Sequence, residues 1–354
     1  MSPVEMPPAP ACSFASDNAA GAHPAVLDAL VRANDGHALA YGDDRWTAEA
    51  VGRFRDLFGA TATPLLAWNG TGANVLALAT MIRPADMVVC SRWAHIAVDE
   101  TGAPERVLGS KLHTLPSADG KLQPEQIDEL AHLVGDVHHA QPGVVSITQS
   151  TELGAVYTAD EVAAICDAAH RLGMKVHLDG ARIANATAAL GGTIEALRSF
   201  TVDAGVDAIS FGGTKAGMAF GEAVILLDPL LAARAPFIRK QVTQLPSKMR
   251  FVAAQFVALL DDDLWIRSAA HANRLAAVLY DATRDIPKIG YDSAPQVNSV
   301  FPVLPAELIE PLQQWCFFWP WDQSRGQVRW MTAWDTTDDD VARFAAGVRA
   351  LCTA

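Results

Sequence analysis

The sequence predicts an α/β protein with a large domain, built on a mainly parallel, doubly wound sheet, and a small C-terminal α+β domain. The chain has 354 residues, 50% of them hydrophobic, which is enough for a large core. Between about residues 64 and 227 short apolar segments alternate with amphipathic helical ones, as in parallel strands joined by helices. Helical segments then dominate. We expect a leader at 1–13, a large domain at 14–247 and a small domain at 248–354.

Charge and cysteine content argue against several classes of function. The formal net charge is −13 and no cluster of Lys or Arg stands out, so neither nucleic acid nor an anionic membrane is an expected partner. The five cysteines are scattered and lack metal-ligand spacing, which favours a reducing, cytoplasmic location without disulfides or a bound metal. The proline-rich leader does not resemble a signal peptide, and we expect it to be disordered.

The first part of the large domain contains a candidate anion site. Helices are expected from Pro24 and over about 46–58, where apolar residues recur on one face, with a turn at 41–44 between them. A strand at 64–68 runs into Gly70, Thr71 and Gly72 and then into an apolar helix that ends near residue 82. The N–H groups at such a helix start favour a phosphate group. An ordinary tight turn with a threonine cap is the alternative.

Three histidines follow in the middle of the chain. After a strand at 87–90, His95 and Asp99 share a face if their segment is helical, at the strand end where ligands bind in open α/β sheets. The alternative is a structural hydrogen bond between them. A helix at 121–134 leads to a loop with His138 and His139, whose side chains point in different directions, so we expect no shared metal there.

Two strand ends carry the residues that point most directly to chemistry. An apolar strand at 144–148 and a helix at 158–173 precede the strand 174–178, which ends at Asp179. The strand 206–212 ends in a glycine turn followed by Lys215. A lysine at a buried strand end is desolvated, and its neutral amine is a nucleophile towards carbonyls. Such a lysine, with an aspartate for a pyridinium nitrogen, is the minimum equipment for pyridoxal phosphate chemistry, although a lone lysine would be a solvated loop residue.

The remaining elements complete the two domains. A strand at 222–227 ends the large domain. In the small domain we expect helices at 248–260, 265–285 and 337–351, and strands at 300–304, 316–319 and 328–331.

Several motifs in the same order resemble one enzyme family. They are His-Leu-Asp-Gly-Ala-Arg at 177–182, Ser-Phe-Gly-Gly-Thr-Lys at 210–215, Gly-Met-Ala-Phe-Gly-Glu-Ala at 217–223, and the segments 14–18, 41–44, 69–74 and 247–251. The sequence resembles the low-specificity L-threonine aldolases, including phenylserine aldolases, from Ser13 to Ala350. These are pyridoxal phosphate enzymes of fold type I, and the resemblance implies an aspartate-aminotransferase-like large domain.

The resemblance also implies how the cofactor is held. Lys215 would form the covalent bond, Asp179 would pair with the pyridinium nitrogen, and His95 would stack on the ring. The other implied cofactor contacts are the phosphate turn and two arginines: Gly70, Thr71, Gly72, Arg182 and Arg250. Arg250, or else Lys248 or Lys240, would reach the phosphate in the neighbouring subunit. The expected assembly is therefore a homo-oligomer with shared sites, most simply a tetramer built as a dimer of dimers.

For the substrate, the resemblance implies a carboxylate clamp and a base. The clamp would be Ser16, Arg182 and Arg329, with Tyr41 as a further substrate contact, because a guanidinium fork fixes a carboxylate through two hydrogen bonds. The candidate bases are His138, His95 and a water ordered by Asp99. Many threonine aldolases outside this branch have a histidine in the segment that is 148–152 here. It is missing, which is why His138 is considered.

The expected activity is reversible retro-aldol cleavage of L-β-hydroxy-α-amino acids, such as threonine, allo-threonine and phenylserine, to glycine and an aldehyde. The same fold would also suit β-elimination, transamination or serine-hydroxymethyltransferase-like chemistry. A non-catalytic protein that keeps the fold is a further alternative, against which the presence of both Lys215 and Asp179 argues.

Overall fold

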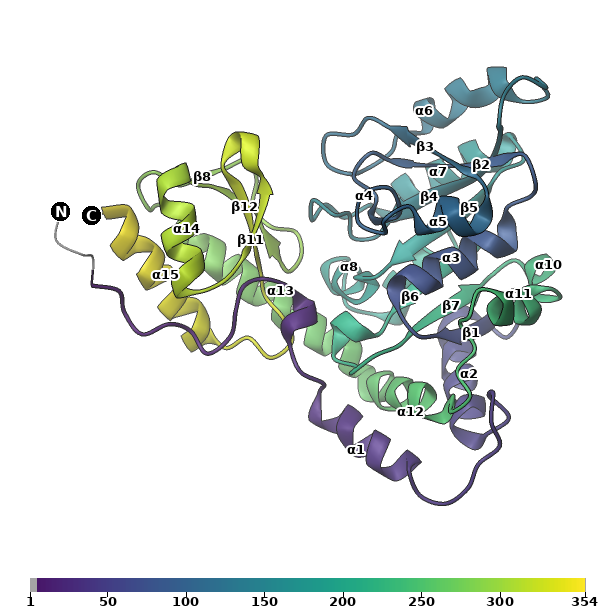
Figure 1. The fold of residues 1–354 in the computed structure, drawn as a ribbon, viewed down its shortest axis with the longest axis horizontal. Helices are drawn as coiled ribbons and strands as arrows, with labels where there is room; N and C mark the ends of the chain where they lie inside the picture. Colours follow the sequence, from purple (N-terminus) through teal and green to yellow (C-terminus); the bar gives the residue numbers. More distant parts are fainter. Residues whose placement is uncertain (1–4, 354) are drawn as a thin grey trace.

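The large domain is built on a seven-stranded mixed sheet with the strand order β1-β7-β6-β5-β4-β2-β3. The computed structural model describes residues 5–353 (Figure 1). The strands of this sheet are β1 (Thr63–Ala67), β2 (Asp86–Ser91), β3 (Lys111–Leu115), β4 (Gln141–Thr148), β5 (Lys175–Gly180), β6 (Ala208–Gly212) and β7 (Glu222–Leu226). In this sheet β7 runs in the opposite direction to the other six strands. The expected α/β class with a mainly parallel sheet is thus confirmed, with β3 as an additional strand.

Helices cover both faces of this sheet. They are α1 (Pro24–Ala33), α2 (Arg45–Phe58), α3 (Gly70–Met81), α4 (His95–Val98), α5 (Ala103–Leu108), α6 (Pro124–Asp128), α7 (Ala159–Arg171), α8 (Ile183–Ala189), α9 (Ile194–Ser199), α10 (Pro229–Ala232), α11 (Ala235–Gln241) and α12 (Arg250–Leu259). Successive residues of β2 point to opposite faces: Met87 and Val89 belong to the buried cluster that includes α7, and Val88 and Cys90 belong to the one that includes α3. Strands buried on both faces explain the continuous apolar runs in the sequence.

The small domain has a five-stranded antiparallel sheet and three helices. The strands are β8 (Gly290–Tyr291), β9 (Ser299–Val300), β10 (Pro302–Val303), β11 (Trp319–Asp322) and β12 (Gln327–Met331), and the helices are α13 (Leu264–Thr283), α14 (Ala306–Trp315) and α15 (Asp338–Thr353). Three features of the small domain differ from the sequence predictions. The strand expected at 316–319 begins at Trp319, the strand at 300–304 is split, and α14 was not expected. In the large domain, the helix expected at 121–134 is shortened to α6 and a 3-10 turn, Glu129–Leu133.

The two cores meet within α13. Its first residues, Trp265 and Ile266, are buried in the large-domain core, and Leu275 and Leu279 are buried in the small-domain core. Residues of α12 also belong to the large-domain core. The change from one hydrophobic core to the other therefore lies inside α13, later in the chain than the domain boundary expected after residue 247. Figure 1 shows α13 running between the two parts.

The expected disorder of the leader is not what the structure shows for residues 5–13. This segment lies along the small domain, where the Trp315 Nε1 donates to the Pro7 carbonyl (2.9 Å) and the Ala11 N–H donates to Asp340 Oδ1 (2.8 Å). These contacts order a proline-rich stretch that forms no helix or strand. Residues 1–4 of the expected leader lie outside the described part of the chain.

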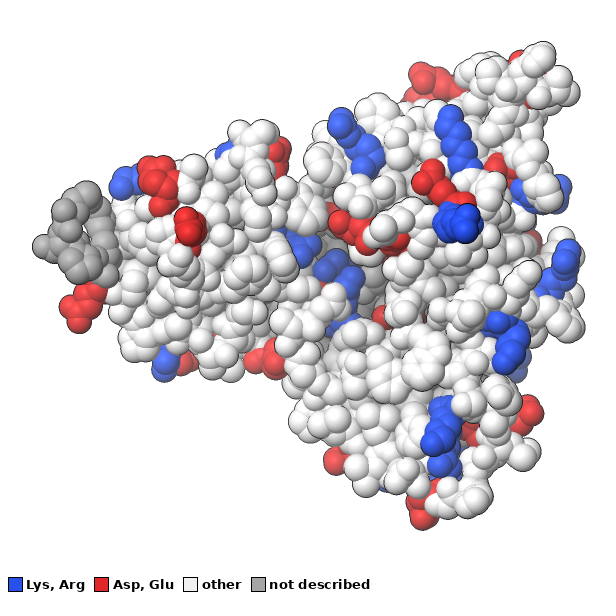
Figure 2. All heavy atoms as spheres, viewed as in Figure 1, with Lys and Arg blue, Asp and Glu red and all other residues white. Residues whose placement is uncertain are grey.

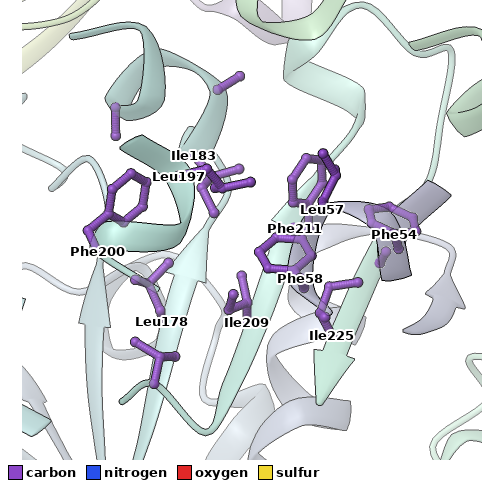
Figure 3. Close-up of a cluster of buried hydrophobic side chains, with 14 of the residues drawn as sticks. Phe54, Leu57, Phe58, Leu178, Ile183, Leu197, Phe200, Ile209, Phe211 and Ile225 are labelled. Atoms are coloured by element: carbon purple, nitrogen blue, oxygen red, sulfur yellow. The ribbon is translucent and has the colours of Figure 1, made fainter. Parts of the chain in front are cut away.

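The packing of Phe211, a buried residue of β6, leads to a stability prediction. Phe211 is fully buried, and its ring centroid lies 5.3 Å from Phe54 and 5.3 Å from Trp265 (Figure 3 labels Phe211 and Phe54). We expect Phe211→Ala to lower the free energy of unfolding by about 3–5 kcal/mol, because it leaves a cavity that rigid neighbours cannot fill. The midpoint of urea unfolding, followed by circular dichroism, measures this. Val278→Ala on the partly exposed face of α13 is the control, and equal midpoints for both variants would contradict the prediction.

Candidate active site

A cavity lies where the carboxyl ends of β4, β5 and β6 meet the start of α3. Its volume is about 510 Å³, part of it open to solvent. The polar residues that line it are Asn74, His95, Glu100, Thr148, Ser150, Glu152, Asp179, Arg182, Ser210, Lys215 and Glu222. The strands are parallel, and Thr148, Asp179 and Ser210 are successive partners across them, so their ends share one edge of the sheet. Figure 2 shows Lys and Arg side chains in the hollow between the two domains, next to Asp and Glu side chains.

Lys215 lies in a 3-10 turn, Thr214–Ala216, directly after β6. Gly212, the last residue of β6, packs so closely on the Ala181 carbonyl that no Cβ fits there. Within residues 5–353 the Lys215 Nζ makes no hydrogen bond or ion pair. Burial lowers the pKa of Lys215, and the charge of Arg182 lowers it further, against the opposite effect of nearby carboxylates. The lysine is thus an amine poised to react with a carbonyl group.

A chain of hydrogen bonds links Asp179 to His95. Asp179, buried near the end of β5, accepts from Ala181 N–H (3.0 Å) and from Asn74 Nδ2 (2.8 Å). Asn74 Nδ2 also donates to Glu100 Oε1 (2.9 Å), which lies 2.8 Å from His95 Nδ1. The hydrogen bond to Glu100 raises the pKa of His95, although burial opposes it. The chain holds an anionic carboxylate and an imidazole ring in fixed positions on one cavity.

Two further carboxyl groups at the cavity have pKa values raised by burial. Burial raises the pKa of Glu152 to about 7 and that of Glu222 to about 7. Glu222 Oε2 accepts from the Gly213 N–H (2.6 Å), beside Lys215. Both groups can therefore hold or release a proton under physiological conditions.

The arginines lie on the side of the small domain. Arg182, the residue before α8, donates from Nε and Nη2 to the two oxygens of Asp17 (2.7 and 2.9 Å). Burial alone would raise the pKa of Asp17, but the charges of Arg182 and Lys215 outweigh it and lower that pKa. Arg329 on β12 lies over the Trp321 ring (4.8 Å), and burial lowers its pKa to about 10. Ser16 precedes Asp17 as the cap of a 3-10 turn, and Arg329 Nη2 donates to the Ala15 carbonyl (3.5 Å), so both arginines contact the segment 15–17.

The start of α3 can hold an anion. Asn69 Oδ1 caps the helix by accepting from the Gly72 N–H (2.8 Å), whereas the N–H groups of Gly70 and Thr71 donate to no partner within residues 5–353. The Gln244 side chain packs against Gly72 and leaves no room for a Cβ there. Free N–H groups and the helix dipole favour a phosphate group. With Lys215 and Asp179, the donor set suits a phosphorylated aldehyde with a basic ring nitrogen.

Comparison with known proteins agrees with this chemistry. Residues 13–306 match the model of the beta-eliminating lyase family.

This chain belongs to the beta-eliminating lyase family.

Relatives within the family carry threonine aldolase names. The chain is 44% identical to the low specificity L-threonine aldolase of Pseudomonas sp. (strain NCIMB 10558), over 96% of this chain and 98% of that protein. It is 43% identical to the enzyme of that name from Pseudomonas aeruginosa, over 95% and 96%. The structure of Leishmania major threonine aldolase matches with a TM-score of 0.90 and 30% identity, over 96% and 99%. The expected class, a carbon–carbon lyase of the L-threonine aldolase type, is confirmed.

More distantly related structures share the fold of this chain. A Rhodobacter sphaeroides aspartate aminotransferase matches with a TM-score of 0.70 at 17% identity over 100% of this chain and 93% of its own, which shows the fold alone. The expected aspartate-aminotransferase-like architecture is therefore confirmed.

Five of the predicted site residues line the cavity: Gly70, His95, Asp179, Arg182 and Lys215. Eight do not: Ser16, Tyr41, Thr71, Gly72, Asp99, His138, Arg250 and Arg329. His138 is exposed in the loop before β4, at the amino end of that strand, whereas the cavity of the same chain is at its carboxyl end. Asp99 is exposed after α4 ends at Val98, and Glu100 takes the contact to His95 instead. Arg250 donates to the Gly36 carbonyl (3.0 Å), and the Tyr41 ring contacts Lys240 (5.0 Å), both away from the cavity of their own chain.

The sequence analysis missed eight polar cavity or clamp residues: Asp17, Asn74, Glu100, Thr148, Ser150, Glu152, Ser210 and Glu222. Asn74 lies one helical turn after the expected phosphate turn, and this spacing could have revealed it. Asp17 and Arg182 are far apart in the chain, and no local pattern signals their ion pair.

Proposed function

We propose that this protein is a pyridoxal phosphate-dependent aldolase that reversibly cleaves L-β-hydroxy-α-amino acids to glycine and an aldehyde. The observation that carries the proposal is the meeting of Lys215, Asp179 and the start of α3 at one cavity. Threonine, allo-threonine and phenylserine are the proposed substrates. The names of the relatives support the first of these.

The residues present fit the cofactor. Lys215 would hold its aldehyde carbon, Asp179 its ring nitrogen, and the free N–H groups of Gly70 and Thr71, next to Gly72, its phosphate. His95 would lie against the ring. When bound, pyridoxal phosphate supplies an electron sink for negative charge on the Cα of an attached amino acid.

The arginines would select the bond that breaks. A carboxylate bound by Arg329 and Arg182, with Ser16 beside them, leaves the substrate Cα in one orientation. Arg182 can contribute only part of its fork, because Asp17 occupies its Nε and one Nη2 hydrogen. Arg329 has a buried Nε without a partner within residues 5–353, so it is the more available cation for the substrate.

A second copy of the chain would complete the site. Arg250, Lys248 and the 36–40 segment line a separate surface hollow, and Tyr41 is half exposed next to it. We place Arg250 and Tyr41 at the cavity of a neighbouring subunit, where Arg250 would bind the phosphate. This supports a homo-oligomer with shared sites, as a dimer or a tetramer.

The location proposed is the cytoplasm. The five cysteines are all unpaired, as expected in a reducing compartment. No helix within residues 5–353 is long and apolar enough to cross a membrane.

Aldehyde release from threonine, allo-threonine and phenylserine, each as L and D form, tests the proposal with cofactor added. We expect glycine and the matching aldehyde from the L forms and none from the D forms, since the clamp fixes one face of Cα. The reverse reaction should join glycine to acetaldehyde. Formation of a 2-oxo acid and ammonia in place of glycine would show β-elimination and contradict the proposal.

A further inference from the structure

The cleavage of a β-hydroxy amino acid needs an acceptor for the hydroxyl proton, and the expected acceptor, His138, lies at the wrong end of the sheet. The cavity itself contains a carboxylate with one oxygen to spare. Glu152 follows β4, and its Oε1 accepts two hydrogen bonds, from the His95 N–H (2.8 Å) and from Thr148 Oγ1 (2.9 Å). Its Oε2 is buried and has no hydrogen-bond partner within residues 5–353.

An unpaired carboxylate oxygen at this position needs an explanation. A buried polar atom without a partner costs about 1–3 kcal/mol, so native proteins rarely keep one without a use. Because Oε1 is fixed by the two donors, Glu152 cannot turn away without losing both bonds. Glu152 lines the cavity, and its Oε2 is a vacant acceptor for a donor that arrives with a ligand.

The imidazole and the other carboxylates at the cavity each already have a hydrogen-bond partner. His95 Nδ1 is bound to Glu100, Asp179 accepts from Asn74 and Ala181, and Glu222 accepts from the Gly213 N–H beside Lys215. Glu100 and Glu152 each have a buried Oε2 without a partner within residues 5–353. Glu100 Oε1 is bound to the His95 ring and to Asn74, whereas Glu152 binds no titratable side chain, so its carboxylate is the one free to take a proton from a ligand.

We propose that Glu152 is the catalytic base that accepts the β-hydroxyl proton of the substrate through Oε2, an inference that rests on the proposed aldolase function. The O–H proton passes to Oε2, and the O–H electron pair becomes the second bond of the aldehyde carbonyl. The Cα–Cβ bond breaks, and its electron pair remains with Cα. Cα then takes up one proton to give glycine, so the cleavage consumes and releases no net proton.

The environment of Glu152 sets the expected pH dependence. Burial raises its pKa to about 7, and the charge of Asp179 adds to this, while the hydrogen bonds from His95 and Thr148 lower it. The other ionisable groups that face it are Cys90 from β2 and Tyr157 before α7. A base must be ionised to act, so kcat/KM for threonine should fall as the pH drops below about 7 and level off above it.

Glu152→Gln separates proton acceptance from positioning. A glutamine keeps an Oε1 acceptor for His95 and Thr148 but cannot take a proton. In the holoenzyme we expect kcat for L-threonine to fall by roughly 100-fold or more. Bound cofactor, measured by absorbance, and α-proton exchange of glycine in D₂O, measured by NMR, should stay near the wild-type values, because glycine has no β-hydroxyl group. The decline of kcat/KM below neutral pH should disappear. Glu129→Gln, on the surface, is the control.

Two outcomes would overturn the inference. Near-wild-type threonine cleavage by Glu152→Gln would show that the carboxylate takes no proton. Equal losses of threonine cleavage and glycine exchange would show that Glu152 only positions His95. A wild-type holoenzyme that performs neither reaction would instead refute the proposed function, and the inference with it.

Discussion

Replacement of Lys215 by alanine should abolish threonine cleavage, with a loss of about 10⁴-fold or more. Lys215 is the only lysine among the described residues that line the cavity, and its pKa is lowered chiefly by burial. Alanine cannot bond to an aldehyde carbon, and the variant would also lose the cation next to Asp17, Asp179 and Glu222. Acetaldehyde release, coupled to its reduction by NADH, measures the rate, and absorbance after desalting measures retained cofactor.

The matched control for Lys215 is Lys175, at the opposite end of the neighbouring strand. Its Nζ forms ion pairs with Asp207 (2.9 Å) and Asp228 (2.7 Å). Lys175→Ala should cost some stability and leave the activity of the holoenzyme intact. Cleavage by Lys215→Ala at more than a few per cent of the wild-type rate would rule out covalent cofactor binding at this residue.

The sequence was sufficient to place the centre of the site because its signal is local. Asp179 and Lys215 each follow a short apolar strand, and the helices between the strands imply parallel pairing. Parallel strands put their carboxyl ends on one edge, so the two side chains had to meet. The register of Asp179 opposite Ser210 places this meeting point at the strand ends.

The structure differs from the expected arrangement near His95 and His138 for different reasons. The pairing of His95 with Asp99 assumed a helix that continues past residue 98, but α4 ends there and Glu100 turns towards the ring. The position of His138 before a strand already indicated the amino edge of the sheet. A residue before a parallel strand lies at the edge of the sheet opposite to the cavity, even if its imidazole could act as a base. This could have been inferred from the sequence.

The contacts made across the chain could not be predicted from the sequence. Asp17 meets Arg182 only because the N-terminal segment passes between the two domains, and Phe14 is buried in the small-domain core. The small-domain strands β8, β9 and β10 have two residues each, too few for a period-2 pattern to be visible. Helix α14 contains Pro311, which weakens its helical signal.

Asp179→Asn should reduce kcat by roughly 30-fold to several thousand-fold, because truncating one partner of a buried, hydrogen-bonded charge pair costs about 2–5 kcal/mol. The amide has the shape of the carboxylate and can still accept from the Ala181 N–H, but it carries no charge to balance a protonated ring nitrogen. The fold should tolerate the change. Asn74 Oδ1 is buried without a partner within residues 5–353, so Asn74 can turn this oxygen towards the new amide.

If Asn74 turns in this way, it loses its hydrogen bond to Glu100. A variant that disturbs this bond but keeps Asp179 is therefore the control for Asp179→Asn. Glu100→Gln disturbs the same hydrogen-bond chain from the other end while leaving the charge of Asp179 in place. If the charge on Asp179 is what matters, Glu100→Gln should lose far less activity than Asp179→Asn, and the absorbance of bound cofactor should change with pH only in Asp179→Asn. Equal losses in both variants would mean that the geometry of the chain, and not the charge at Asp179, controls the reaction.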